Sequence, residues 1–119
     1  MAENTTYTLT KYAGNDGLVQ GSVVFDSTTI TAADYVEIDV GFQPRVVVWE
    51  NATDRTNGAH YKGMADESCI KTAAAGTRTL EVTGGNKGIT LTTRGFKVAQ
   101  NATLALILAS KTCYFTAHP

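Results

Sequence analysis

An antiparallel β-sandwich of jelly-roll-like type is the fold class that the amino-acid sequence predicts, and three features predict it. Threonine, valine and isoleucine recur in short clusters, and these residues prefer the pleated, half-exposed surface of a sheet. Eleven glycines provide turns, whereas only two prolines interrupt the chain. Several segments alternate between apolar and polar residues, as a strand with one wet face does. Seven or eight short strands separated by turns are typical of a sandwich.

The size, composition and charge of the chain limit the number of domains and the classes of partner. Its 119 residues suffice for one domain with its own core and are too few for two. Hydrophobic residues make up 43% and charged residues 18% of the chain, a balance that excludes a disordered protein. The formal net charge is −1 and no run of like charges occurs. Bulk electrostatics therefore predict neither nucleic acid nor a membrane as a partner.

We expect an extended N-terminal arm over residues 1–17 and the β-sandwich domain over residues 18–119. The arm is polar apart from three apolar positions, Tyr7, Leu9 and Tyr12. A segment of this kind rarely offsets the entropy of its own ordering. It is therefore predicted to become ordered by lying across a neighbouring copy of the chain.

Three strands are predicted in the first half of the domain. Residues 18–25 follow a glycine-rich turn and form the first. Residues 34–40 alternate cleanly, which places apolar side chains on one face and Glu37 and Asp39 on the other. A turn that contains proline ends this strand. Residues 45–51 are apolar at consecutive positions, which predicts a central strand that is covered on both faces.

The second half of the domain is predicted to contain shorter elements. They are a polar loop, a weak strand, one or two helical turns, a five-residue-loop hairpin and three further strands. The loop is expected over residues 51–58, the weak strand over 59–64, and the helical turns over 65–75. The hairpin is expected over 79–93, and the three further strands over 94–98, 103–109 and 112–117.

No catalytic or metal-binding constellation is recognisable, so the chain is predicted not to be an enzyme and to need no cofactor. His60 and His118 are the only histidines, and zinc-ligand spacings are absent. Cys69 and His60 could be written as a nucleophile and its base, but a packed thiol beside a solvated imidazole is the favoured interpretation. Cys69 and Cys113 are expected to be two separate thiols, although their number allows one disulfide.

A sugar-binding face is a second hypothesis. Trp49, Arg55, His60 and Tyr61 could combine aromatic walls with oriented polar groups, as ligand pockets do. Trp49, however, lies within a strongly apolar strand, which favours a core or interface position for it.

The apolar run over residues 104–109 does not alternate, although a strand of a two-layer sandwich should. If the run is a strand, its outer face has to be covered, and the readiest cover for a small chain is another copy. The other interpretation is an alternating strand with Ala105, Ile107 and Ala109 pointing outward. The first interpretation predicts a subunit interface, formed by Tyr7, Leu9, Tyr12, Leu104, Leu106, Ile107 and Leu108.

Residues 36–54 contain three segments in succession. They are an alternating strand, a Gly41-Phe42-Gln43-Pro44 turn, and a valine-rich strand that ends in an Asn/Thr/Asp loop. This stretch resembles a segment common in virion proteins of tailed bacteriophages and prophages. Further segments are similar in order and spacing, over residues 88–89, 94–98 and 114–117. The resemblance extends over residues 18–117.

Small proteins of this family serve as capsid decoration (cement) proteins or as tail-fibre modules, are commonly trimeric, and in some cases resemble H-type lectins. The length of the chain favours decoration, because a fibre tip usually belongs to a longer chain. The resemblance thus implies a homotrimer, made in the bacterial host cytoplasm and located on the capsid surface of the virion. It would bind the major capsid protein of the mature head and stabilise the shell, and the interface residues above would then include capsid contacts. The alternative is a tail-fibre or receptor-binding module that uses the glycan face.

Overall fold

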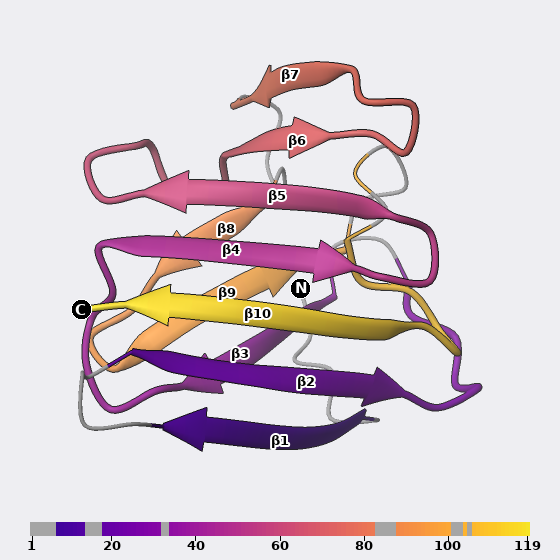
Figure 1. Ribbon diagram of the computed structural model, residues 1–119, viewed down its shortest axis with the longest axis horizontal. Coiled ribbons are helices and arrows are strands. Elements are labelled where there is room, and N and C mark those ends of the chain that lie inside the picture. The colour runs from indigo at the N-terminus through magenta and orange to yellow at the C-terminus, as the bar shows by residue number, and fades with distance from the viewer. Residues whose placement is uncertain (1–6, 14–17, 32–33, 83–87, 101–103, 105) are drawn as a thin grey trace.

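Two antiparallel β-sheets packed face to face make up the protein (Figure 1). The computed structural model describes residues 7–13, 18–31, 34–82, 88–100, 104 and 106–119. These residues form ten strands and contain no helix. The predicted fold class, an antiparallel all-β sandwich, is confirmed.

The larger sheet has seven strands and is the front layer in Figure 1. In order across the sheet they are β1 (Tyr7–Ala13), β2 (Val19–Phe25), β10 (Thr112–His118), β4 (Val46–Asn51), β5 (Thr56–Tyr61), β6 (Cys69–Thr72) and β7 (Arg78–Glu81). Burial alternates along β2, β4, β5 and β10. One face of this sheet therefore lies in the core, and the other points away from it.

The smaller sheet lies behind the larger one in Figure 1 and covers its inner face. Its strands are β3 (Tyr35–Asp39), β9 (Gly95–Ala99) and β8 (Ile89–Leu91), in that order. Val36 and Ile38 of β3 are buried, whereas Glu37 and Asp39 are exposed. The alternation predicted for this strand is confirmed.

Three aromatic rings form the centre of the core. Trp49 of β4 is paired with Phe115 of β10, and their rings stack at 6.1 Å with an interplanar angle of 9°. Phe96 of β9 meets both rings edge-on, at 6.1 Å from Trp49 and 5.4 Å from Phe115. Gly58 lies opposite Trp49 on β5, where an added Cβ would come within 2.9 Å of the Leu106 side chain. The absence of a side chain at Gly58 leaves space for the packing around Trp49.

The central strand predicted over residues 45–51 is β4, the fourth of the seven strands, but it is covered on only one face. Val47 and Trp49 point into the core and are fully buried. Val46 and Val48 point to the other face and stay half-exposed. Within a single chain, the prediction of cover on both faces is therefore wrong.

The strand predicted over residues 103–109 is also wrong. In the part of this segment that the structure describes, residues 104 and 106–109, the backbone forms turns and bends. Leu104, Leu106 and Ile107 are fully buried within the single chain, and Leu108 is half-buried. Trp49 Nε1 donates to the backbone oxygen of Leu106 over 2.8 Å. An irregular segment can bury consecutive side chains, so this apolar run needs no second copy to cover it.

The N-terminal arm differs from its prediction over residues 7–13, which form β1. This strand pairs with β2 along its whole length, from Tyr7 opposite Phe25 to Ala13 opposite Val19. The rings of Tyr7 and Phe25 lie 5.8 Å apart, and Leu9 also packs against the core. Lys11 Nζ donates to the backbone oxygen of Asp39 over 3.0 Å.

The segment is ordered by its own sheet rather than by a neighbouring copy, and Tyr12 lies in β1 opposite Gln20. The rest of the predicted arm, residues 1–6 and 14–17, lies outside the described residues.

Two further predictions for the second half are corrected. No helical turn forms over residues 65–75, which instead contain β6. The segments predicted as one hairpin belong to different sheets, because β7 pairs with β6 whereas β8 pairs with β9. A glycine-rich loop between two alternating segments is equally compatible with a crossing from one sheet to the other. The strand order was not predictable from this local pattern.

Candidate interaction surfaces

The glycan face predicted from Trp49, Arg55, His60 and Tyr61 does not form. Trp49 is 0% exposed and His60 is 1% exposed, with its Nδ1 2.8 Å from the backbone oxygen of Ser68. Arg55 lies in the turn that joins β4 to β5, whereas Tyr61 is the last residue of β5. The two exposed side chains therefore occupy opposite ends of one strand, and the two others belong to the core.

The residues predicted as a subunit interface are mostly core residues. Leu104, Leu106 and Ile107 are enclosed by the two sheets, as described above. Tyr7 and Leu9 are half-buried and pack toward the smaller sheet. The apolar run therefore gives no reason to expect self-association, and a subunit interface would have to lie on another surface.

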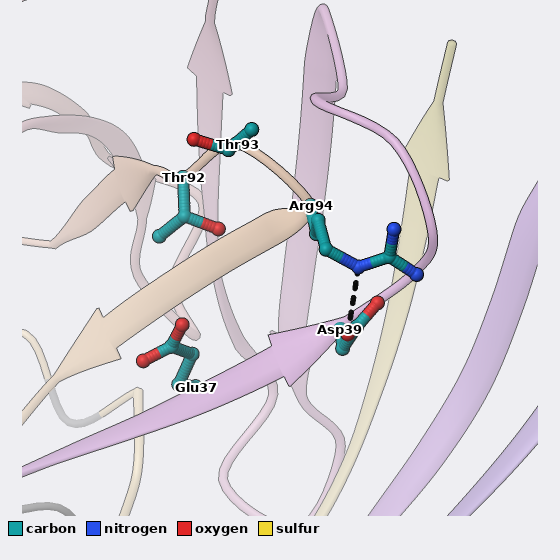
Figure 2. A pocket seen from close by; sticks show the side chains of 5 residues that line it. All are labelled: Glu37, Asp39, Thr92, Thr93 and Arg94. Atoms are coloured by element: carbon teal, nitrogen blue, oxygen red, sulfur yellow. Dashed lines mark hydrogen bonds and ion pairs between the residues drawn. The ribbon is translucent and has the colours of Figure 1, made fainter.

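A polar cleft of about 270 Å³ lies beside the smaller sheet (Figure 2). Glu37 and Asp39 project from the outer side of β3, and the turn between β8 and β9 contributes Thr92, Thr93 and Arg94. Arg94 Nε donates to Asp39 Oδ2 over 3.2 Å. Backbone hydrogen bonds from Val40 and Gly41 to the oxygen of Arg94 hold the same turn.

The ion pair in this cleft joins β3 to the turn between β8 and β9 and offers little chemistry. The hydrogen bond from the Arg94 side chain, followed by that from the Gly41 backbone, lowers the pKa of Asp39 below its ordinary value. A carboxylate that stays ionised in this way is a poor general acid. The ion pair is exposed and contributes little to stability.

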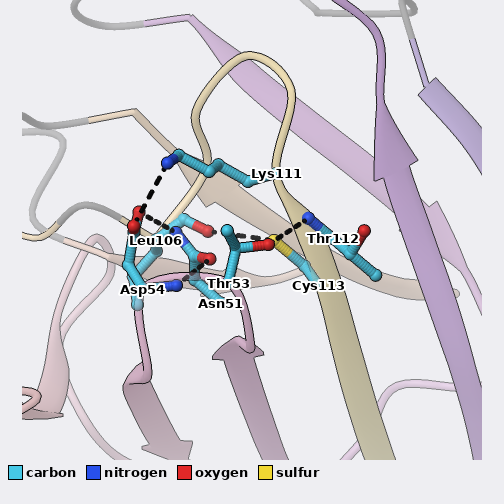
Figure 3. A network of polar contacts seen from close by, with 7 residues as sticks. All are labelled: Asn51, Thr53, Asp54, Leu106, Lys111, Thr112 and Cys113. Carbon is cyan, nitrogen blue, oxygen red and sulfur yellow. Dashed lines mark hydrogen bonds and ion pairs between the residues drawn. The ribbon is translucent and has the colours of Figure 1, made fainter.

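A polar network closes the end of the sandwich around Asn51 (Figure 3). Asn51 is fully buried; its Nδ2 donates to Asp54 Oδ2 over 3.0 Å, and its Oδ1 accepts from the Asp54 backbone nitrogen over 3.2 Å. Lys111 Nζ lies 3.1 Å from Asp54 Oδ1, and the Thr112 backbone nitrogen donates to Thr53 Oγ1. These bonds fix the turn after β4 against the start of β10. The network is structural, because its polar groups are used by one another.

The two cysteines are free and buried, which confirms that they are separate thiols. Burial raises the pKa of Cys69 to about 11 and that of Cys113 to about 12. The Cys113 thiol donates to the backbone oxygen of Leu106 over 3.5 Å. A thiolate at Cys69 is therefore disfavoured near neutral pH, which argues against a nucleophile paired with His60. The thiol is packed as expected, but the imidazole of His60, which was expected to be solvated, is buried.

These buried thiols should make the protein less stable in alkaline solution. Above about pH 9 the thiols of the unfolded chain ionise while the folded ones keep their protons, so the unfolded state is favoured. The free energy of unfolding should fall by up to about 1.4 kcal/mol per pH unit for each thiol, until the pH passes the folded pKa values of about 11 and about 12. Urea titrations at about pH 8 and about pH 10 measure this difference. Replacing both cysteines with alanine should flatten the dependence, and an unchanged slope would contradict the prediction.

Within the described ranges, no group of three or more His, Cys, Asp and Glu side chains is placed to hold a metal ion. Those ranges also hold no helix of the length and apolar character that crossing a membrane requires.

The surface of the larger sheet that points away from the core, here called the outer face, is poor in charge and carries several exposed apolar side chains. The alternation and strand pairing give its members: Thr8, Thr10, Gln20, Ser22, Val24, Val46, Val48, Glu50, Asn57, Ala59, Tyr61, Ile70, Thr72, Arg78, Leu80, Thr112, Tyr114, Thr116 and His118. Glu50 and Arg78 are the only Asp, Glu, Lys or Arg residues in this set. Leu80 is 61% exposed, Tyr114 47%, and Val24 and Tyr61 45% each. Depletion of charge with exposed tyrosine and aliphatic residues is characteristic of protein interfaces.

The opposite surface of the sandwich has a different character. On the smaller sheet, Glu37 and Asp39 of β3 face outward beside Lys97 of β9, and Arg94 lies next to them. The ammonium group of Lys97 also lies 4.9 Å from the centre of the Tyr35 ring. Charged side chains thus cluster on the small surface and are nearly missing from the large one. The outer face was not predicted from the sequence, although the consecutive valines at 46–48 were a signal of it.

The fold and surfaces define a compact all-β sandwich protein with one charged and one charge-poor sheet surface. Comparisons of the chain with protein-family models, with curated proteins and with solved structures found no match.

Proposed function

We propose that this chain is a non-catalytic structural protein that binds other proteins through its outer face, and that it decorates the capsid shell of a tailed-phage virion. The contrast between the two sheet surfaces supports the first part of the proposal. Exposed apolar side chains such as Tyr114 and Leu80 are costly to keep in water, and a protein partner would bury them. The resemblance of residues 36–54 to phage virion proteins supports the second part.

The mechanism of such a protein is differential binding. A decoration protein that binds the expanded shell more tightly than its dissociated or unexpanded forms stabilises the expanded shell by that difference in affinity. Many weak contacts suffice, because a shell presents many equivalent sites. No bond is made or broken, which agrees with the buried thiols and the ion-paired Asp39. Binding of the outer face to a shell does not depend on whether two or three copies of the chain assemble.

Binding to phage heads tests the proposal. Purified protein mixed with mature undecorated heads should sediment with them at a fixed stoichiometry, and it should stay in the supernatant with unexpanded heads. Tyr114→Asp, which puts a charge at the centre of the outer face, should weaken binding by about tenfold or more. Thr93→Asp adds the same charge beside the smaller sheet and serves as the matched control. Equal binding to both kinds of head, or none to either, would contradict the proposed function.

A further inference from the structure

The outer side chains of β4, β5, β6 and β7 form two parallel rows that cross four strands. Strand pairing places Glu50, Asn57, Thr72 and Arg78 opposite one another in the first row. It places Val48, Ala59, Ile70 and Leu80 opposite one another in the second row. The first row is polar, with a negative charge at one end and a positive charge at the other. The second row is wholly apolar.

The outer side chains of these four strands are here called the β4–β7 patch. We infer that this patch packs face to face against the same patch of a second copy of the chain. The inference rests on the proposed function, and it names one contact that the structural protein would make. The two copies would be related by a twofold axis that runs parallel to the strands and passes between β5 and β6. Such an axis exchanges β4 with β7 and β5 with β6 between the copies, and it leaves the position along the strands unchanged. Each row therefore meets itself.

Charge complementarity supports this occupant. The axis brings Glu50 of each copy to Arg78 of the other, so that two equivalent ion pairs form at the two sides of the patch. Among the residues that the structure describes, neither Glu50 nor Arg78 takes part in a salt bridge within its own chain. An unrelated partner would need an acidic and a basic group at matching positions, whereas a second copy supplies both by symmetry.

The apolar row is complementary in the same arrangement. Val48 meets Leu80 of the second copy, and Ala59 meets Ile70, so that small and large side chains alternate across the contact. Two twisted sheets commonly pack about 10 Å apart with their strands at about 30°. The same angle arises here if the strands of each copy are inclined to the axis by about half of it, within the plane of the sheet. The half-exposed Val48, which lacks cover on this side of β4, then becomes buried.

The size of the patch predicts a weak, reversible dimer. Four strands about 4.8 Å apart and about five residues long, at about 3.3 Å per residue, project roughly 300 Å² per copy. Two copies then bury between roughly 600 and 1,000 Å², which is the range of transient contacts. Copies held side by side on a shell would have a high effective concentration, so a weak contact would suffice there. The β2–β10 half of the outer face, with Val24 and Tyr114, stays free for the shell.

Charge reversal in solution tests the arrangement by sedimentation over a range of protein concentrations. The wild-type chain should pass from monomer to dimer as its concentration rises. Glu50→Arg and Arg78→Glu should each weaken the dimer by about tenfold or more, because each places like charges together twice. The double variant, which exchanges the two charges, should bring the dissociation constant back to within about threefold of the wild-type value. Glu37→Arg, on the opposite surface, is the control with the same change in net charge as Glu50→Arg.

Several results would overturn the inference. A chain that stays monomeric at the highest concentration, a trimeric mass, or single reversals that act no differently from Glu37→Arg would each do so. Circular dichroism of the variants identifies any that fail to fold, and the restoration by the double variant is a readout that misfolding cannot mimic. A monomeric chain that still binds mature heads would overturn only this inference. A dimer that binds no heads would contradict only the proposed function.

Discussion

Replacing Trp49 with alanine should lower the free energy of unfolding by about 3–5 kcal/mol, the range for removing a large aromatic side chain from a core. The substitution removes the ring that stacks on Phe115 and meets Phe96 edge-on. It also removes the donor to the buried backbone oxygen of Leu106. Because small domains are stable by only about 5–15 kcal/mol, much of the variant could be unfolded at 37 °C. Urea titration followed by circular dichroism measures the loss without depending on tryptophan fluorescence.

Trp49→Phe separates the ring from its hydrogen bond. Phenylalanine keeps aromatic packing but lacks the indole N–H, so we expect a smaller loss of about 1–3 kcal/mol. Tyr61→Ala, which removes an aromatic side chain from the outer face, should cost less than about 1 kcal/mol at concentrations where the chain is monomeric. If Trp49→Ala were no more harmful than Tyr61→Ala, the three-ring core would be wrong.

Gly95→Ala should have the second large effect, a loss of about 3 kcal/mol, because the new methyl group would collide with backbone. Gly95 lies opposite Asp39 in the pairing of β9 with β3. A Cβ built there lies 1.8 Å from the backbone oxygen of Ile38, far inside van der Waals contact. Backbone cannot move aside as the end of a side chain can, so β3 and β9 would have to separate locally. Thermal unfolding should show a lower midpoint, and the exposed Arg94–Asp39 pair beside it should be disturbed in NMR spectra.

Gly76→Ala is the matched control for this substitution. Gly76 has a φ of +94° and open space where a Cβ would lie, so alanine there meets no atom and costs only backbone strain. That strain should amount to about 1 kcal/mol. The ratio of the two losses therefore distinguishes collision from conformational preference. A Gly95→Ala variant as stable as the Gly76→Ala variant would show that β3 and β9 are farther apart than described.

The strands that could be predicted from sequence are those whose alternation reflects burial on one face. Residues 34–40 and 112–117 alternate because each lies in a sheet with one face in the core, and they form β3 and β10. Strand β4 was predicted from its apolar run. β1 was not predicted, since only Tyr7 and Leu9 mark its inner face and its partner lies across a turn.

The pairing of strands far apart in the sequence, and the burial of an irregular segment, could not be predicted from the local pattern of apolar and polar residues. The chain between β7 and β8 looks like a hairpin loop in sequence, yet β7 and β8 belong to different sheets. Residues 104–109 look like a strand because they are apolar, but an irregular segment buries them equally well.

For the candidate surfaces too, neighbouring residues in the sequence predicted some features, whereas others depend on the fold. A core or interface position for Trp49 was favoured from its apolar neighbours, and the structure places it in the core. Val46 and Val48 indicated a second covered face, but only the fold shows that the chain itself leaves that face open. The proposed pairing of Glu50 with Arg78 across a twofold axis depends on the register of four strands. No spacing along the chain reveals it.

Strand β10 is the last of the ten to be synthesised, yet it lies between β2 and β4 in the interior of the larger sheet. As the chain leaves the ribosome, the pair β1–β2 and the meander β4–β5–β6–β7 therefore emerge as two pieces, each with a bare hydrogen-bonding edge. Both edges can recruit other chains until β10 is inserted, which brings Phe115 onto Trp49 and joins the pieces. Nascent chains would then be most prone to aggregate just before synthesis of this strand ends, so chaperone supply during expression should govern the yield of folded protein.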